Sequence, residues 1–145
     1  MQYIKNIENV WHIEEYYSGY LPTVWSGLSV GAKELIRESR NGLKSSESFH
    51  DGVVHSIQIE TAARNNLYKN NINLELHLAC GEQLLVMYDD VLYFEMCKSI
   101  SMVPIPPICA HELTIGSEGE LVHEIAFLGS DIWRFVFMDV TLKQK

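Results

Sequence analysis

Residues 71–80 read NINLELHLAC, a stretch in which apolar and polar side chains alternate. Successive side chains of an extended strand point to opposite faces. One face would therefore carry Ile72, Leu74, Leu76, Leu78 and Cys80. The other face would carry Asn73, Glu75, His77 and Ala79. This pattern predicts a β-strand with one face on the core and the other in water.

The same period of two appears on both sides of this stretch. In residues 52–61, GVVHSIQIET, it predicts a strand with Val53, His55, Ile57 and Ile59 on one face. Residues 62–71, AARNNLYKNN, contain paired asparagines and predict a turn or a long hairpin loop. A strand is also expected over residues 83–88, before a turn or bulge at Asp89-Asp90.

The C-terminal part of the chain predicts an antiparallel meander. Residues 104–107 hold three prolines and are expected to form an irregular connection, because proline cannot donate to a strand ladder. The runs 111–116, 121–128 and 132–142 follow, with short turn signals between them. The fold class is therefore predicted to be mainly β (α+β), an antiparallel sheet or sandwich of six to seven strands.

The first 47 residues have a different pattern. Ile7, Val10 and Trp11 have helical spacing, and Ser29 and Gly42 could begin and end a second helix. One or two short N-terminal helices are therefore expected. The 145 residues suit a single domain, in which a helical or irregular segment, 1–47, packs on an antiparallel β core, 48–145.

Composition narrows the classes of function. The net charge is −8, and residues 73–145 hold 4 basic and 11 acidic side chains against 7 and 8 in residues 1–72. Such a field repels nucleic acid and attracts a basic protein. No apolar run is long enough to cross a membrane, and the N-terminus lacks a signal-peptide pattern, which predicts a cytoplasmic location. Cys80, Cys97 and Cys109 are expected to be buried, reduced thiols.

The pair His50-Asp51 allows two interpretations. Adjacent His-Asp pairs are metal ligands in one class of helical phosphohydrolases, but Gly52 and a β-branched run follow here. A turn at the start of a strand, with Gly52 supplying a permissive φ, is the favoured interpretation. The alternative is a small metal- or ligand-binding β-domain enzyme using His50, Asp51 and His55, with His77 and His123 converging on the same pocket. No cofactor, metal site or catalytic residue is predicted.

Several motifs together resemble a known type of protein. Phe49-His50-Asp51-Gly52 leads into a strand, residues 88–94 read YDDVLYF, and a strand pair runs from His123 to Leu142. In this order they are similar to small bacterial proteins that look like immunity proteins, the partners of toxins in interbacterial competition, including contact-dependent growth inhibition. The likeness covers roughly residues 48–142.

The resemblance implies a stoichiometric inhibitor without catalytic residues of its own. Its partner would be a cognate protein toxin, often with a basic nuclease domain. Acidic side chains could occupy the cationic groove of such a toxin, and the candidates are Glu75, Glu82, Asp89, Asp90, Glu118, Glu120 and Asp131. Aromatic anchors could come from Trp11, Tyr16, Tyr17 and Trp25, although such residues also attach helices to sheets. A structural module assembling through an exposed sheet edge is a third possibility, and the oligomeric state stays open.

Overall fold

The computed structural model describes residues 1–8, 10–41, 45, 47–64, 67–96, 105–129 and 131–145. It confirms the mainly β fold: the described strands form three antiparallel sheets, one of two strands and two of four. The ten described strands exceed the six to seven that were predicted. None of the described helices is long and apolar enough to cross a membrane.

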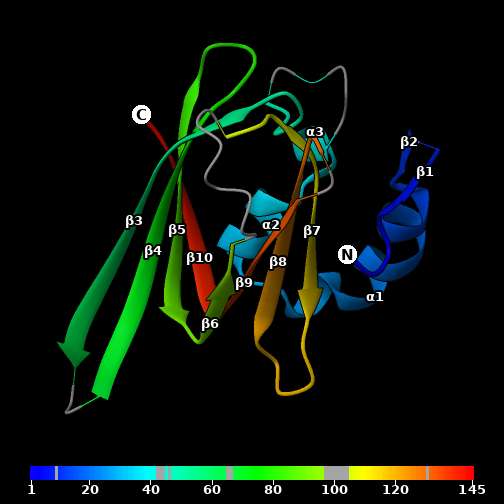
Figure 1. Ribbon diagram of the computed structural model, residues 1–145. Coiled ribbons are helices and arrows are strands. Elements are labelled where there is room, and N and C mark those ends of the chain that lie inside the picture. Colours follow the sequence, from blue (N-terminus) through cyan, green and yellow to red (C-terminus); the bar gives the residue numbers. More distant parts are fainter. Residues whose placement is uncertain (9, 42–44, 46, 65–66, 97–104, 130) are drawn as a thin grey trace.

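The two four-stranded sheets pack face to face as a sandwich (Figure 1). Sheet 1 has the order β10 (Asp139–Gln144), β5 (Gln83–Val91), β4 (Leu67–His77), β3 (Val53–Arg64). Sheet 2 has the order β6 (Tyr93–Glu95), β9 (Ile132–Phe137), β8 (Leu121–Phe127), β7 (Ile108–Ile115). The meander predicted for residues 111–142 is confirmed as far as Phe137.

Aromatic rings join the two sheets at the centre of the core. Tyr88 of β5 stacks on Phe135 of β9, with ring centroids 4.7 Å apart, and its edge contacts Phe137 at 4.8 Å. All three side chains are fully buried. Alternating apolar residues from the inner faces of both sheets therefore form one core.

Two strands pass from one sheet to the other at the same place. β5 belongs to sheet 1 and continues beyond Leu92 as β6 of sheet 2, while β9 of sheet 2 continues beyond Met138 as β10 of sheet 1. The single strand predicted over 132–142 is therefore wrong. The bulge predicted at Asp89-Asp90 fits the positive φ of 51° at Asp90, which helps the chain turn this corner.

The β3–β4 hairpin is longer than predicted. The loop expected over residues 62–71 is wrong, because pairing continues as far as Arg64 opposite Leu67. A register shift between Val54 and Ser56 makes His55 the extra residue of a β-bulge. Val54 therefore faces the core, with only 9% of its surface exposed, and the single face predicted for Val53, His55, Ile57 and Ile59 is wrong, because Val53 lies opposite His77 and Ile57 lies opposite buried Leu74.

The N-terminal segment mixes strands and helices. A hairpin of β1 (Lys5–Ile7) and β2 (Val10–His12) replaces the helix predicted around residues 7–14, and Glu8 adopts a positive φ of 51° beside its turn. A π-helix, η1 (Glu15–Tyr20), α1 (Leu21–Val24) and the 3₁₀ turn η2 (Trp25–Gly27) follow. Ser29 caps α2 (Val30–Leu35) as predicted, and α3 spans Glu38–Asn41; Gly42 lies outside the described residues.

Buried polar contacts attach this segment to sheet 2. The Glu112 carboxylate, 1% exposed, accepts hydrogen bonds from the backbone N–H groups of Gln2, Tyr3 and Ile4 at 2.7, 2.9 and 2.6 Å. Tyr16 Oη donates to the Leu113 carbonyl and accepts from the Leu113 N–H. On sheet 1, Gly31 of α2 lies so close to Val140 that an added Cβ would sit 1.7 Å from the Val140 carbonyl oxygen.

Candidate functional site

The crossing of the two strand pairs creates a surface patch of mixed apolar and acidic character. Leu92, between β5 and β6, is 63% exposed, and Met138, between β9 and β10, is 50% exposed. The Leu92 N–H donates to the Val136 carbonyl, and the Met138 N–H donates to the Asp89 carbonyl at 3.2 Å. Asp139 pairs directly with Asp89 across the ladder. We call Asp89, Asp90, Leu92, Met138 and Asp139 the corner patch.

The carboxylates of this patch are held by local contacts. Asp90 forms an ion pair with Lys69 of the neighbouring strand β4. Asp139 Oδ1 accepts hydrogen bonds from Ser29 Oγ at 2.7 Å and from the Val140 N–H at 2.8 Å. The patch thus carries three acidic groups, of which Asp90 is paired with Lys69, on a backbone held by the ladders of two sheets.

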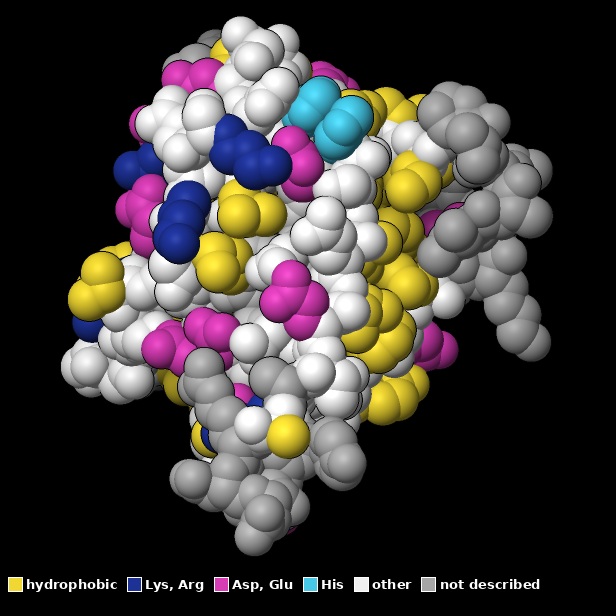
Figure 2. All heavy atoms as spheres, turned by 90° about the vertical axis from the view of Figure 1, so that its left-hand side faces the viewer, with side chains coloured by type: hydrophobic (Ala, Val, Ile, Leu, Met, Phe, Trp, Pro, Cys, Tyr) yellow, Lys and Arg dark blue, Asp and Glu magenta, His cyan; other side chains and the backbone are white. Residues whose placement is uncertain are grey.

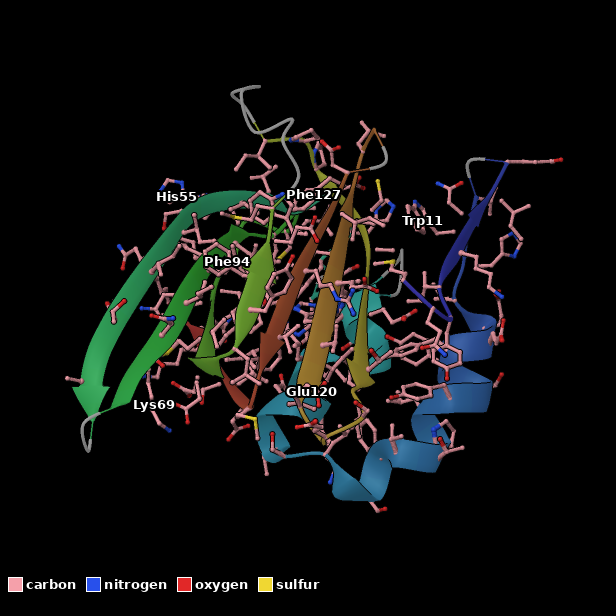
Figure 3. The ribbon with its side chains drawn as sticks, turned by 60° about the horizontal axis from the view of Figure 1, so that its bottom comes forward. Trp11, His55, Lys69, Phe94, Glu120 and Phe127 are labelled. Carbon is pink, nitrogen blue, oxygen red and sulfur yellow. The ribbon has the colours of Figure 1, made fainter. Side chains whose placement is uncertain are left out.

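Further acidic residues lie at the same end of the sandwich. The turn between β7 and β8 contains Glu118 and Glu120. The Glu120 carboxylate accepts a hydrogen bond from the Glu118 N–H. Leu121, which follows this turn, pairs with Phe137, which precedes the corner. Figure 1 shows the β7–β8 turn and both strand crossings at the lower end of the molecule, and Figure 3 labels Glu120 there. Four of the seven predicted acidic contact residues therefore share one end.

The other three predicted acidic residues lie elsewhere. Glu82 follows β4 and lines a polar pocket of about 430 Å³ together with Arg37 and Arg40. Asp131 precedes β9, at the end of that strand opposite the corner. Glu75 lies on the outer face of sheet 1. The predicted acidic residues do not form one continuous face.

The predicted aromatic anchors have three different environments. Tyr16, one of the predicted anchors, is fully buried in the core, and its hydroxyl donates to the Leu113 carbonyl. Tyr17 is half-buried, and its hydroxyl donates a hydrogen bond to the Ile36 carbonyl. Trp11 lies between the β1–β2 hairpin and sheet 2 (Figure 3). Trp25 is 40% exposed, with Lys33 Nζ 5.8 Å from its ring centroid. Only Trp25 presents a largely accessible ring.

The turn predicted at His50-Asp51-Gly52 is present, but its geometry differs in detail. Asp51, not Gly52, has the positive φ, 63°, which aspartate tolerates better than most residues. A Cβ at position 52 would lie only 2.9 Å from the Phe49 carbonyl oxygen, so the lack of space for a side chain explains why glycine occupies this position. The Asp51 carboxylate contacts His50 Nδ1 at 3.0 Å.

His50 and Asp51 line a pocket of about 350 Å³ with Trp11 and Cys109. Burial raises the pKa of the Cys109 thiol, the hydrogen bond with Trp11 lowers it less, and the charge of Asp51 raises it further. A thiol with a raised pKa is a poor nucleophile at neutral pH. Cys80 is exposed, so the burial predicted for it is wrong, and Cys97 lies outside the described residues.

The histidines do not converge as the enzyme alternative requires. His123 lies in the core, where its Nδ1 is 2.7 Å from Tyr88 Oη and its Nε2 is 3.1 Å from His111 Nδ1. Burial lowers the pKa of His111 to about 3 and the pKa of His123 well below its usual value, so both rings stay neutral. This network is part of the core and is closed to substrate.

A second histidine pair lies on the outer face of sheet 1. The bulge at His55 places its ring on that of His77, with centroids 4.2 Å apart and planes 9° from parallel. Glu75, two residues before His77 on β4, completes a group whose possible ligand atoms all lie within 4.8 Å of one another. The enzyme alternative grouped His55 with His77 but not with Glu75, and the bulge that brings all three to one face has no signal in the alternating pattern.

Comparisons of this chain with protein-family models, with curated proteins and with solved structures found no match. The corner patch is the candidate functional site for which the described residues supply both exposed apolar area and charge of one sign.

Proposed function

We propose that this chain is an immunity protein that binds a cognate bacterial toxin in the cytoplasm and neutralises it as a stoichiometric complex. The expected target is a basic nuclease domain. One observation carries the proposal: Leu92 and Met138, two largely exposed apolar side chains, lie among three aspartates on a rigid strand corner. The interaction would require no chemistry on the chain itself.

The composition of the corner patch suits a protein interface. Interfaces gain most of their free energy from a few apolar or aromatic anchors that are desolvated on binding, while the surrounding residues exclude water. Leu92 and Met138 can serve as such anchors. The adjacent carboxylates then discriminate in favour of a cationic partner and accelerate the encounter.

The rigidity of the corner supports tight binding. Both strand crossings are held by backbone hydrogen bonds, and the ladders continue on either side as Asp139 opposite Asp89 and Tyr93 opposite Val136. A surface fixed in this way loses little conformational entropy when a partner docks. Affinity therefore does not have to offset the ordering of a loop.

The distribution of charge agrees with a basic target. The chain has a net charge of −8, and the end of the sandwich that bears the corner patch also bears Glu118 and Glu120. A nuclease binds phosphates through a cationic groove, and an acidic protein surface can replace the phosphates in that groove. Inhibition would follow from occupation of the groove.

The test is co-expression with the toxin domain encoded beside this gene. We expect restored growth and a 1:1 complex on gel filtration. The double variant Leu92→Asp/Met138→Asp should weaken binding by roughly several hundred-fold, because two anchors of about 2 kcal/mol each are lost. Val30→Asp is the matched control, since Val30 is 85% exposed and lies at the start of α2. Equal protection by the double variant and the control would disprove the role of the patch.

A further inference from the structure

Two imidazoles and a carboxylate gather on the outer face of sheet 1, away from the corner patch. Glu75 and His77 alternate on β4 and therefore share a face, opposite Ser56 and Val53 of β3. The bulge between Val54 and Ser56 adds His55 to that face. Figure 3 shows His55 pointing outward from β3, and Figure 2 shows two histidine side chains side by side next to an acidic and a basic one.

From this arrangement we infer that His55, Glu75 and His77 bind a divalent transition-metal ion, with Zn²⁺ as the reference ion. Two neutral imidazoles and one carboxylate are a common protein donor set for such ions, and they leave a fourth position open to water. The site is independent of the proposed function, because none of its residues belongs to the corner patch.

Binding of an ion requires the His55 ring to rotate out of its stack on His77, because the ring planes are 9° from parallel and an ion lies in the plane of each imidazole that binds it. The possible ligand atoms lie within 4.8 Å of one another. With Zn–N and Zn–O distances of about 2.1 Å, ligand atoms around a tetrahedral ion are separated by roughly 3.4 Å. The His55 side chain is exposed, and rotation about its side-chain bonds can close this gap without a change in the strands.

One ring nitrogen points to a cation independently of the spacing. Within the described part of the chain, His77 Nε2 is shielded from solvent and has no hydrogen-bond partner; the nearest acidic atom is Glu75 Oε1 at 3.9 Å. A shielded polar atom without a partner is unusual and commonly marks a bound water or ion. A metal ion between His77 Nε2 and Glu75 would satisfy both groups.

The ammonium group of Lys145 contacts the carboxylate oxygen of Glu75 that the metal ion would bind. Lys145 Nζ lies 2.9 Å from Glu75 Oε1, while Ser56 Oγ donates to the other carboxylate oxygen at 3.1 Å. The lysine hydrogen bond is the main reason why the pKa of Glu75 lies below its usual value. The group thus already holds one positive charge, and a metal ion has to displace the ammonium from Oε1.

Because Lys145 competes with the metal ion for Glu75, removing the lysine should raise the affinity of the site for the ion. Lys145→Met removes the competing ammonium and should strengthen Zn²⁺ binding. Lys143→Met removes the same charge two residues earlier on the same face of β10, where no ion pair with Glu75 is formed, and should leave affinity nearly unchanged. A gain in the first variant but not in the second separates displacement of Lys145 from a general change in net charge.

The experiment titrates the full chain with Zn²⁺ by calorimetry and with Co²⁺ by visible absorption. We expect one ion per chain, and a loss of affinity of at least ~10-fold in each of His55→Ala, Glu75→Gln and His77→Ala. His12→Ala, His50→Ala and Cys80→Ser control for other exposed donors, and circular dichroism checks that each variant folds. Failure of the wild-type chain to bind either ion, or equal binding by the wild-type chain and the three site variants, would overturn the inference.

Discussion

Tyr88, His123 and His111 form a hydrogen-bonded row that links the inner faces of the two sheets, because Tyr88 belongs to β5 and the histidines belong to β8 and β7. Phe49 stacks on His111 at 4.5 Å and separates the row from solvent. Burial favours the neutral form of both imidazoles, and burial also raises the pKa of Tyr88. The row therefore stabilises the fold only while its histidines are uncharged.

This network predicts a loss of stability in mild acid. Below the ordinary imidazole pKa of 6.5 the unfolded chain binds protons at His111 and His123, whereas in the folded chain burial lowers the pKa of His111 to about 3 and the pKa of His123 well below its ordinary value. The stability is complete above pH 6.5 and falls as the pH decreases through this window, by about 1.4 kcal/mol per pH unit for each fully contributing histidine. Urea unfolding at several pH values measures the slope. NMR titration in which these two imidazole signals moved near pH 6.5 would contradict the explanation.

The hydrogen bonds of Glu112 should make a large contribution to the attachment of the N-terminal segment to sheet 2. The Glu112 carboxylate is the acceptor for three consecutive backbone N–H groups, at residues 2–4. Glu112→Gln removes the charge from these bonds and leaves one oxygen as acceptor, which should lower the free energy of unfolding by about 2 kcal/mol. Hydrogen exchange of the three amides should accelerate. The control Glu14→Gln alters an exposed carboxylate and should leave both measurements near wild type.

At the scale of elements, the packing of α2 on β10 depends on one missing side chain. Gly31 would normally weaken a helix, yet an added Cβ would lie 1.7 Å from the Val140 carbonyl oxygen. The backbone of α2 at Gly31 therefore packs directly on the backbone of β10 at Val140, with no room for a side chain between them. Ser29 adds a second connection by capping α2 and donating to Asp139 at the start of β10.

Gly31→Ala should destabilise the protein although alanine is the better helix former. The gain in helix propensity is about 1 kcal/mol, while displacing α2 from β10 should cost roughly 3 kcal/mol, for a net loss of about 2 kcal/mol. Gly27→Ala is the matched control, since a Cβ there meets nothing within 4 Å. Thermal unfolding compares the two variants. A Gly31→Ala variant as stable as the control would show that α2 can shift at little cost.

At the scale of the whole molecule, charge gathers at the end of the sandwich that bears the corner patch. Asp89 lies opposite Asp139, and like charges in directly facing positions weaken a ladder. A cationic partner would relieve this repulsion on binding. Under the proposed function, this pair contributes to recognition of the basic partner.

Neutralising this end should slow association with the toxin domain. Asp89→Asn/Asp90→Asn keeps side-chain shape, and asparagine tolerates the positive φ at position 90. The association rate constant should fall several-fold at low ionic strength and converge with that of the wild type at high salt. Glu14→Gln/Glu60→Gln removes the same charge elsewhere and serves as the control. Equal association rates for all three proteins at low salt would remove the electrostatic argument.

The sequence by itself determined the local features of this protein. Alternation in residues 71–80 is sufficient to predict β4 and its buried face, since the period of two depends only on the extended backbone. Ser29 as a helix cap and His50-Asp51-Gly52 as a turn are local for the same reason. The spacing of Ile7, Val10 and Trp11 was misleading, because Ile7 pairs with Val10 in a short hairpin that leaves both side chains exposed, and of the three only Trp11 is partly buried.

Only the tertiary structure decided which strands pair and which side chains meet. Residues 132–142 have one continuous pattern, yet the chain divides at Met138 between two sheets because its partners, β5 and β6, divide at Leu92. The bulge at His55 is likewise set by pairing with β4. The corner patch and the group of His55, Glu75 and His77 both arise at such irregularities, where long-range hydrogen bonding overrides the period of the local sequence.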